Sequence, residues 1–260
     1  MSILAYHSVD PRFDWGATRV TPRQFERQVA WAAGKGYSFV TVSEYLERKR
    51  RQPGEKIVAL TFDDGFESAY RYAYPVLAKY GAKATVFIIA GYVGQWNTWD
   101  VNIGWIRFRH LTWGQIKELS QSGWEIGSHG LSHLDLTRLP ASHVLKEINA
   151  AKRLIEDRIN VPAKAISYPF GNVNARVADM ARGAGHDCGF VMGRSNKKIP
   201  SPYAVPRLGV YLFDSLLSFR QKTDGRIGLF YRSLQKFLDI CSDGTVIVKQ
   251  GLLKRPKNCA

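Results

Sequence analysis

The sequence predicts an α/β fold in which parallel strands alternate with helices and form either a closed barrel or an open wound sheet. Short apolar runs alternate with amphipathic segments at the spacing of βαβ units along most of the chain. Two of these runs, residues 57–62 and 84–89, are almost unbroken, which is typical of strands covered on both faces. A length of 260 residues, 45% of them hydrophobic, suits one barrel domain with a sizeable core.

Local signals place the individual elements. Thr21 followed by Pro22 is typical of a helix start, and Ser43 is the expected cap of the next helix. Pro75 should kink or shorten the helix in which it lies. Residues 91–110 form a long irregular stretch rich in Trp, Gly and Asn, which indicates a functional loop. We expect strands at residues 3–6, 37–42, 57–62, 84–89, 124–127, 165–167 and 188–192. We expect helices at residues 21–34, 43–51, 65–80, 112–121 and 139–158, and a further helix that ends at residue 183.

The composition limits the partners and the cellular location. The formal net charge of +15, with a pI near 9.8, favours anionic partners. No zinc finger, basic zipper or RNP-like stretch is present in the sequence, so we expect no specific nucleic acid partner. Cys188, Cys241 and Cys259 show neither a disulfide framework nor metal-ligand spacing. Since we recognise no secretory signal and no bilayer-spanning segment, we expect a cytoplasmic location, either free or peripheral at the inner membrane face.

Polar side chains gather where the predicted strands end. Asp63 and Asp64 follow a buried strand, His129 and His133 follow another, and His7 follows the first. The C-terminal ends of parallel strands meet at one edge of a sheet or one rim of a barrel, where functional groups collect. Taken singly, each of these features is more often a turn or an exposed polar residue than a site. Their joint placement predicts a functional site.

The residue types in this group indicate a metal site. Two neighbouring carboxylates repel each other unless a cation or a hydrogen-bond donor compensates. Two histidines four positions apart are expected to lie on one side of a helical turn and bind one ion. Asp64, His129 and His133 would then leave open positions for water and substrate. This ligand set suits Zn²⁺, and also Co²⁺, Ni²⁺ or Mn²⁺. Asp63 would be free to act as general base, because alternate residues of an extended segment point in different directions.

Three blocks of sequence resemble the polysaccharide deacetylase family, the NodB-type domain of carbohydrate esterase family 4. They are Thr-Phe-Asp-Asp-Gly, Ser-His-x-x-Ser-His and Tyr-Pro-Phe-Gly, within a similarity that spans residues 57–210. The resemblance implies a distorted (β/α) barrel and a metal-dependent removal of N-acetyl groups. It implies Asp63 as the general base, and Asp64, His129 and His133 as the metal ligands. It also implies that a backbone N–H near Phe170 stabilises the oxyanion.

Two positions depart from the family pattern. Ser167 stands where the family often has an arginine that orients the catalytic aspartate, and Arg207 is our hypothesised replacement. The family's general-acid histidine usually lies near the C-terminus, but no histidine follows His186. His7 is the preferred general acid, because Tyr6-His7-Ser8 resembles a motif on the first strand of circularly permuted relatives that act on poly-N-acetylglucosamine. His186 precedes a strand and so lies at the wrong end for catalysis.

The substrate-binding prediction centres on the long loop. Aromatic faces beside polar groups suit stacking on a sugar ring, although core packing is the alternative for a single Trp. The predicted substrate contacts are Trp96, Asn97, Trp99, Asp100 and Tyr168.

We divide the chain into a catalytic domain, residues 1–222, and a helical, basic C-terminal appendage, residues 223–260. The appendage would either pack against the barrel or rest on an anionic membrane surface. The predicted function is metal-dependent hydrolysis of N-acetyl groups on a sugar or polysaccharide, for which the basic charge favours an anionic, lipid-linked or nucleotide-linked glycan. One alternative is an amidohydrolase acting on a small non-sugar amide. The other is a non-catalytic protein of the same fold that binds a glycan or nucleic acid.

Overall fold

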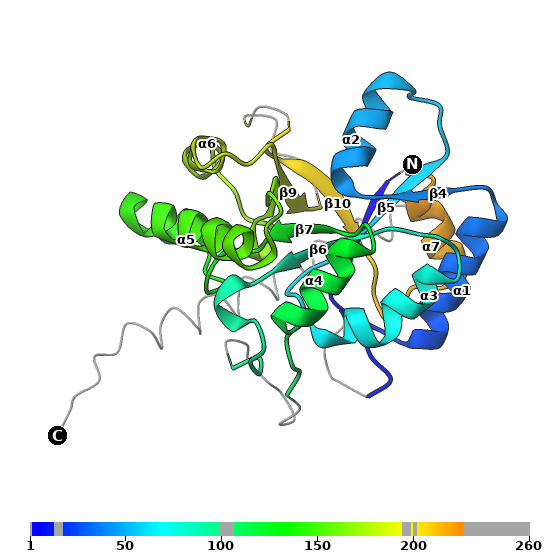
Figure 1. Ribbon diagram of the computed structural model, residues 1–260. Helices are drawn as coiled ribbons and strands as arrows, with labels where there is room; N and C mark the ends of the chain where they lie inside the picture. The colour runs from blue at the N-terminus through cyan, green and yellow to red at the C-terminus, as the bar shows by residue number, and fades with distance from the viewer. Residues whose placement is uncertain (1, 13–17, 99–106, 194–198, 200–201, 226–260) are drawn as a thin grey trace.

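The computed structural model describes residues 2–12, 18–98, 107–193, 199 and 202–225 of the chain (Figure 1). The predicted contacts Trp99 and Asp100, and residues 226–260 of the predicted appendage, lie outside the described residues. The last described helix, α7 (Leu216–Thr223), runs through the predicted boundary at 222/223. Among the helices of the described residues, none has the length and apolar character needed to cross a bilayer.

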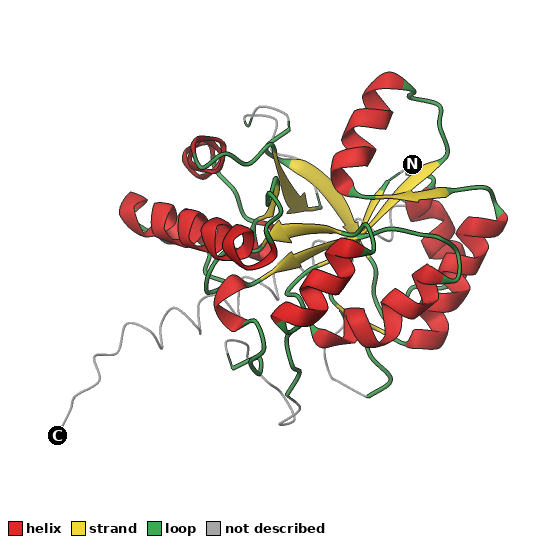
Figure 2. Cartoon of the chain, viewed as in Figure 1, coloured by secondary structure: helices red, strands yellow, loops and turns green. Residues whose placement is uncertain are grey.

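Seven parallel strands close into a barrel, because β1 pairs with β10 on one side and with β5 on the other. Figures 1 and 2 show the strands at the centre of the molecule with the helices around them. The order around the barrel is β1 (Ile3–Tyr6), β10 (Val205–Gly209), β9 (Cys188–Met192), β8 (Ala165–Ser167), β7 (Glu125–Ser128), β6 (Thr85–Ile88) and β5 (Ile57–Phe62). The closed barrel is thus confirmed over the open sheet, and all seven strands end at the same rim.

Three short strands lie outside the barrel. β4 (Ser38–Val40) pairs with residues 57–59 of β5, just before β6 takes over the same strand at Thr61. β2 (Ser8–Val9) and β3 (Arg19–Val20) form a small separate sheet. All the strands predicted from the sequence are present within about two residues of their predicted bounds.

β10 was not predicted as a strand, because Pro206 argues against a central strand. The structure accommodates this proline because β10 pairs with β1 only from Leu208 onward, after the proline. Before that point β10 pairs with β9 alone, from Val205 to Arg207. Arg207 is part of β10, where it pairs with Met192 of β9, and its side chain is fully buried.

The helices follow the predicted order. Thr21 caps α1 (Pro22–Gly34) as predicted, and Thr112 caps α4 (Trp113–Gln121). Thr41, not Ser43, caps α2 (Val42–Arg51) in a capping box with Glu44. Ser43 instead donates a hydrogen bond to Glu125 at 2.6 Å. The helices are α1 (Pro22–Gly34), α2 (Val42–Arg51), α3 (Tyr74–Ala78), α4 (Trp113–Gln121), α5 (Ala141–Ile159), α6 (Ala175–Gly183) and α7.

Pro75 shortens its helix as predicted. Its missing N–H and fixed φ are tolerated only in the first turn of α3, where it lies. A π-helical turn, Ala69–Ala73, precedes it and takes the place of a continuous helix.

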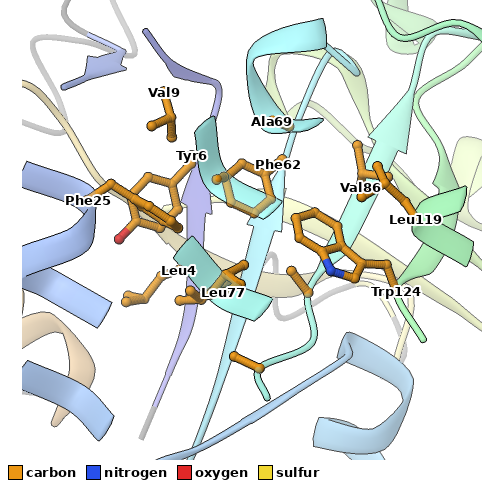
Figure 3. Packing of buried hydrophobic residues seen from close by; sticks show 14 of the residues in the cluster. Leu4, Tyr6, Val9, Phe25, Phe62, Ala69, Leu77, Val86, Leu119 and Trp124 are labelled. Atoms are coloured by element: carbon orange, nitrogen blue, oxygen red, sulfur yellow. The ribbon is translucent and has the colours of Figure 1, made fainter. Parts of the chain in front are cut away.

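The largest core cluster packs α1, α3 and α4 against the barrel (Figure 3). The ring of Phe62 stacks on Tyr6 at 5.6 Å and on Trp124 at 5.4 Å between centroids. Tyr6 also donates a hydrogen bond to Gln28 at 2.9 Å. Because Tyr6 and Phe62 are the last residues of β1 and β5, this packing fixes the strand ends from which His7 and Asp63 follow.

Candidate active site

The C-terminal rim of the barrel brings together the polar residues that the sequence singled out. Asp63 and Asp64 follow β5, and His129 follows β7 directly. All three side chains are buried, as is that of His133. Parallel strands of a closed barrel deliver side chains from distant parts of the chain to one rim.

Asp64, His129 and His133 form a candidate metal site, with donor atoms that all lie within 4.8 Å of one another. The Oδ1 atom of Asp64 is 3.5 Å from Nε2 of His129 and 3.4 Å from Nε2 of His133. Ligands bound about 2.0–2.1 Å from a tetrahedral zinc ion lie about 3.3–3.4 Å apart. The three donors therefore fit a divalent ion, and the described residues leave open which one.

The backbone reaches this geometry in a way that the sequence analysis did not anticipate. His129 and His133 lie in a loop after β7, not on a helical turn, and His133 has a φ of 55°. Asp64 has a φ of 66°, so the chain turns sharply there instead of continuing as an extended segment. Left-handed backbone at non-glycine residues is strained by about 1–3 kcal/mol and persists where the surroundings enforce it.

Hydrogen bonding orients the nitrogen of His129 that faces the candidate metal site. Its Nδ1 lies 2.7 Å from the carbonyl oxygen of Ser167 and donates to it, which leaves Nε2 as the lone-pair donor facing Asp64. Burial by itself raises the pKa of Asp64, but His129 and His133 in their protonated forms outweigh it and lower that pKa. An ionised carboxylate and an imidazole with a free Nε2 are the forms that bind a cation.

Arg207 holds Asp63 with both ends of its guanidinium group. Nη1 donates to Oδ1 of Asp63 and Nη2 to Oδ2, each at 2.7 Å. Nη1 also donates to the hydroxyl of Thr61 at 3.0 Å, and Nη2 to that of Ser167 at 2.7 Å. Arg207, the hypothesised replacement for the family's arginine, therefore contacts Asp63 from another strand. Ser167, which stands at the arginine's usual position, accepts one of its hydrogen bonds.

The surroundings keep this pair dry and fixed. Arg207 is fully buried, and its guanidinium carbon lies 5.1 Å from the ring centre of Phe87 and 6.0 Å from that of Phe190. Burial raises the pKa of Asp63, but the charges of Arg207 and His129 outweigh it and lower that pKa. Asp63 is therefore an ionised acceptor, held in one orientation by a planar bidentate contact.

His7 lies at the same rim as the two aspartates. It follows β1 directly, is half-buried, and its charge contributes to the lowered pKa of both aspartates. Its Nδ1 contacts no hydrogen-bond partner among the described residues. β1 pairs with β10, the last barrel strand along the chain.

His186, the competing candidate for the general acid, is buried before β9, at the opposite end of the barrel from the rim. Burial and the charge of Lys152 lower the pKa of His186 to about 4. Between pH 6.5 and 4 the unfolded chain therefore binds a proton at this position that the native chain does not, so stability falls with falling pH.

We expect the free energy of unfolding to drop by about 3 kcal/mol over this interval because of His186. In His186→Gln this part of the pH dependence should disappear, which urea unfolding at several pH values would measure. His143→Gln, an exposed position on α5, is the control and should keep the wild-type slope. An unchanged slope in His186→Gln would contradict the assignment.

Phe170 lies in a tight turn, Pro169–Gly171, between the candidate metal site and the barrel wall. Its φ is 61°, and its ring centre is 4.7 Å from that of His133. The turn's own hydrogen bonds run from Gly171 N–H to Tyr168 and from Asn172 N–H to Pro169. Since the N–H of Phe170 meets no acceptor in the part of the chain that the structure describes, it can serve an oxyanion.

The predicted substrate contacts separate into two kinds. Trp96 is exposed by 45% and stands beside Arg109. Asn97 is buried and its Oδ1 accepts a hydrogen bond from the N–H of Phe108 at 2.7 Å, so it holds the loop together. Tyr168 is fully buried in the second core cluster, which does not fit the direct substrate contact that we predicted for it. Asn97 and Tyr168 differ from the prediction for the same reason, because a polar or aromatic residue near a site can point toward the protein core.

Two supporting residues were missed by the sequence analysis. His110, buried, places its Nδ1 2.8 Å from the carbonyl oxygen of Asp64. Glu147 of α5 accepts hydrogen bonds from the N–H groups of Leu131 and Ser132 at 3.1 and 2.9 Å. A signal for Glu147 existed, because it is a lone acid on the apolar face of a helix.

Replacing Glu147 with Gln should weaken zinc binding by about 10–100-fold, since it loosens the loop between the two histidines. Isothermal titration of the full chain with Zn²⁺ would measure the change. Asp157→Asn, exposed on the same helix, should bind zinc as the wild type does. Equal affinities in Glu147→Gln and Asp157→Asn would show that the loop does not depend on Glu147.

The closed parallel barrel, with two aspartates and two histidines at its C-terminal rim, defines a NodB-type (β/α) barrel protein. The family model described as polysaccharide deacetylase matches residues 50–189, more than half of the chain. The chain therefore belongs to the polysaccharide deacetylase family, as its sequence motifs indicated.

Two curated relatives illustrate the similarity. The chain is 34% identical over 191 residues to the putative polysaccharide deacetylase YxkH of Bacillus subtilis, covering 73% of this chain and 63% of that protein. It is 29% identical over 203 residues to the poly-beta-1,6-N-acetyl-D-glucosamine N-deacetylase of Staphylococcus aureus, covering 73% of this chain and 67% of that protein. The similarity thus spans about two thirds of these relatives' length.

Two solved structures share the fold over nearly their whole length. The deacetylase PplD of Streptococcus pyogenes, solved in complex with acetate, superimposes with a TM-score of 0.74 at 26% identity, covering 86% of this chain and 97% of that one. IcaB from Ammonifex degensii gives a TM-score of 0.72 at 26% identity, covering 85% and 96%.

Proposed function

We infer that the chain is a metal-dependent hydrolase that removes N-acetyl groups from an N-acetylated sugar or polysaccharide and yields acetate and a free amine. The poly-N-acetylglucosamine deacetylase among its relatives and the acetate-bound deacetylase among similar structures support this reaction class. The observation that carries the proposal is the contact between Asp63 and Arg207, beside three convergent donors for a cation.

Each step of the reaction has a residue at the rim in this proposal. Asp63, kept ionised by Arg207, takes a proton from the water that adds to the acetyl carbonyl carbon. The N–H of Phe170 donates to the oxyanion of the tetrahedral intermediate. His7 donates a proton to the leaving nitrogen as the C–N bond breaks. The burial of Asp63 and Arg207 excludes bulk water from the proton acceptor.

Asp64, His129 and His133 are the residues that would hold the divalent ion. Such an ion lowers the pKa of bound water and polarises a carbonyl group. Imidazole and carboxylate donors favour Zn²⁺, with Co²⁺, Ni²⁺ and Mn²⁺ as the other candidates.

Acetate release from N-acetylglucosamine oligomers, with and without a chelator, tests the function. We expect release that stops with chelator and returns with Zn²⁺. Release from small acetamides alone would favour an amidohydrolase, and glycan binding without product would favour a non-catalytic protein. Either result would overturn the proposal.

We also propose that the protein's partner is an anionic membrane surface or a lipid-linked glycan. The net charge of +15 supports it, while most of the segment that would carry the contact, residues 223–260, lies outside the described residues. The cytoplasmic location stays a prediction from the sequence.

A further inference from the structure

We propose that a cavity beside the candidate active site binds a phosphate or carboxylate substituent, so that the preferred substrate is an anionic N-acetylated sugar. This inference rests on the proposed function, because it specifies the substrate class of the same site. The cavity has a volume of about 280 Å³. Sites for whole small molecules span about 300–1,000 Å³, so this space suits one sugar residue or one substituent.

The cavity shares a wall with the segment that carries the two aspartates. Phe66 and Glu67 line it, and they follow Asp64 almost immediately in the chain. The ring of Phe66 stacks on His110 at 5.1 Å, and His110 in turn contacts the carbonyl oxygen of Asp64. Glu67 N–H donates to the carbonyl oxygen of Arg109, another lining residue, at 2.8 Å. The cavity therefore adjoins the segment that carries Asp63 and Asp64, so a substituent of a sugar bound at the site could reach it.

The lining is positively charged, with three guanidinium groups against two carboxylates. Asp10 is buried and directed at Arg12, which donates to both of its carboxylate oxygens at 3.0 and 2.8 Å. The nearest approach of Glu67 to Arg71 joins a carboxylate oxygen to Nε at 3.4 Å. Within the described residues, Arg71 donates no hydrogen bond to a carboxylate. The cavity thus holds more donors than its own acids use.

Arg109 is the second guanidinium group with unused donors. It lies over the ring of Trp96 at 5.3 Å, and no carboxylate in the described ranges contacts it. A guanidinium group that stacks on an aromatic face keeps its N–H donors in the plane, where an oxyanion can accept two of them. An isolated surface arginine would simply be solvated. Here the aromatic ring holds its orientation at the cavity.

Aromatic surface beside these charges suits a sugar ring. Trp96 is exposed by 45%, and Phe108 and Tyr72 complete the apolar part of the lining. A sugar ring can stack on an exposed indole while a charged substituent reaches the arginines. The same cavity offers a neutral glycan the stacking alone, and this difference predicts a preference for anionic substrates.

The test compares three substrates at low salt: N-acetylglucosamine 1-phosphate, N-acetylmuramic acid and the neutral methyl N-acetylglucosaminide. With the zinc-loaded full chain, we expect kcat/KM for acetate release to be at least 10-fold higher for an anionic substrate than for the neutral one. The phosphate and carboxylate probes identify which oxyanion is favoured. Arg109→Gln should lower the anionic-to-neutral ratio by about 10-fold or more, as expected for a lost charge-assisted hydrogen bond.

Arg71→Gln gives a second variant on another wall, with the same expected loss of preference. Arg220→Gln is the matched control, because Arg220 of α7 also lies 5.3 Å from a tryptophan ring, that of Trp31 on α1. The control should keep the wild-type ratio. A wild-type ratio near one, or equal losses on all three substrates in Arg109→Gln, would overturn the proposed anion site.

Calorimetric binding separates a failure here from a failure of the proposed function. If no sugar releases acetate, titration of the full chain with N-acetylglucosamine 1-phosphate still tests the cavity. Binding at least 10-fold tighter than that of the neutral glycoside, and lost in Arg109→Gln, would support the anion site alone. Equal binding of both would reject it. Acetate release without any anionic preference would reject the anion site and leave the deacetylase function standing.

Discussion

Replacing Arg207 with Met is expected to lower kcat/KM at neutral pH by about 100-fold or more and to move the acidic limb of the pH profile upward. Burial raises the pKa of Asp63, and at present the charge of Arg207 is the largest influence that lowers it. Without Arg207, the carboxylate would become protonated at a higher pH and lose its fixed orientation. Acetate release measured from pH 4 to pH 9 would record both effects.

The folding consequence of this replacement has to be separated from its effect on the reaction. Removing one partner of a buried ion pair destabilises a protein by about 3–5 kcal/mol. Arg207→Lys keeps a charge but loses the planar bidentate contact, so we expect a smaller upward shift of the acidic limb and a lowered kcat. If both variants lose activity with no movement of that limb, Arg207 contributes packing only. Full turnover in both would refute the role altogether.

Zinc binding should fall by more than 100-fold in His129→Ala and in His133→Ala, because even residues that only orient metal ligands contribute about 10–100-fold. In the wild type, zinc at 100 times its dissociation constant should stabilise the fold by about 2.7 kcal/mol. Both variants should lose this stabilisation, together with acetate release. Calorimetric titration and thermal unfolding with and without Zn²⁺ are the measurements.

His143→Ala is the control for these two variants. This histidine is exposed on α5 and belongs to none of the described metal-ligand groups. It should therefore match the wild type in affinity and in stabilisation. If all three alanine variants bind zinc alike, the ion is held elsewhere and the candidate metal site is wrong.

The sequence predicted most of the barrel because its strands are short apolar runs with clear boundaries. Ile57–Phe62 is buried throughout, and its end at Asp63 was visible as an abrupt change from apolar to acidic residues. β10 was not predicted, because proline is rare in central strands and Pro206 lies in this one. The structure tolerates Pro206 because β1 pairs with β10 only beyond it, from Leu208 onward. A register between two strands is a property of the closed barrel and leaves no local signal.

The candidate site shows the same division. Asp63, Asp64, His129 and His133 were predicted from their types and their places after strands. The reasons given for their geometry were wrong in part, because left-handed backbone at Asp64 and His133 replaces the expected strand and helix. Asn97 and Tyr168 turned out to face inward, which neither residue type nor spacing could reveal.

The sequence by itself determined the α/β class, the order of the strands along the chain and the chemical groups available at their ends. These features depend on local patterns of apolar, polar and cap-forming residues. Tertiary structure decided the geometry in which these groups meet. The contact of Arg207 with Asp63, 144 residues apart, exists because β1 closes the barrel between β5 and β10. Such a contact depends on closure and burial, which join distant strands and which no local pattern encodes.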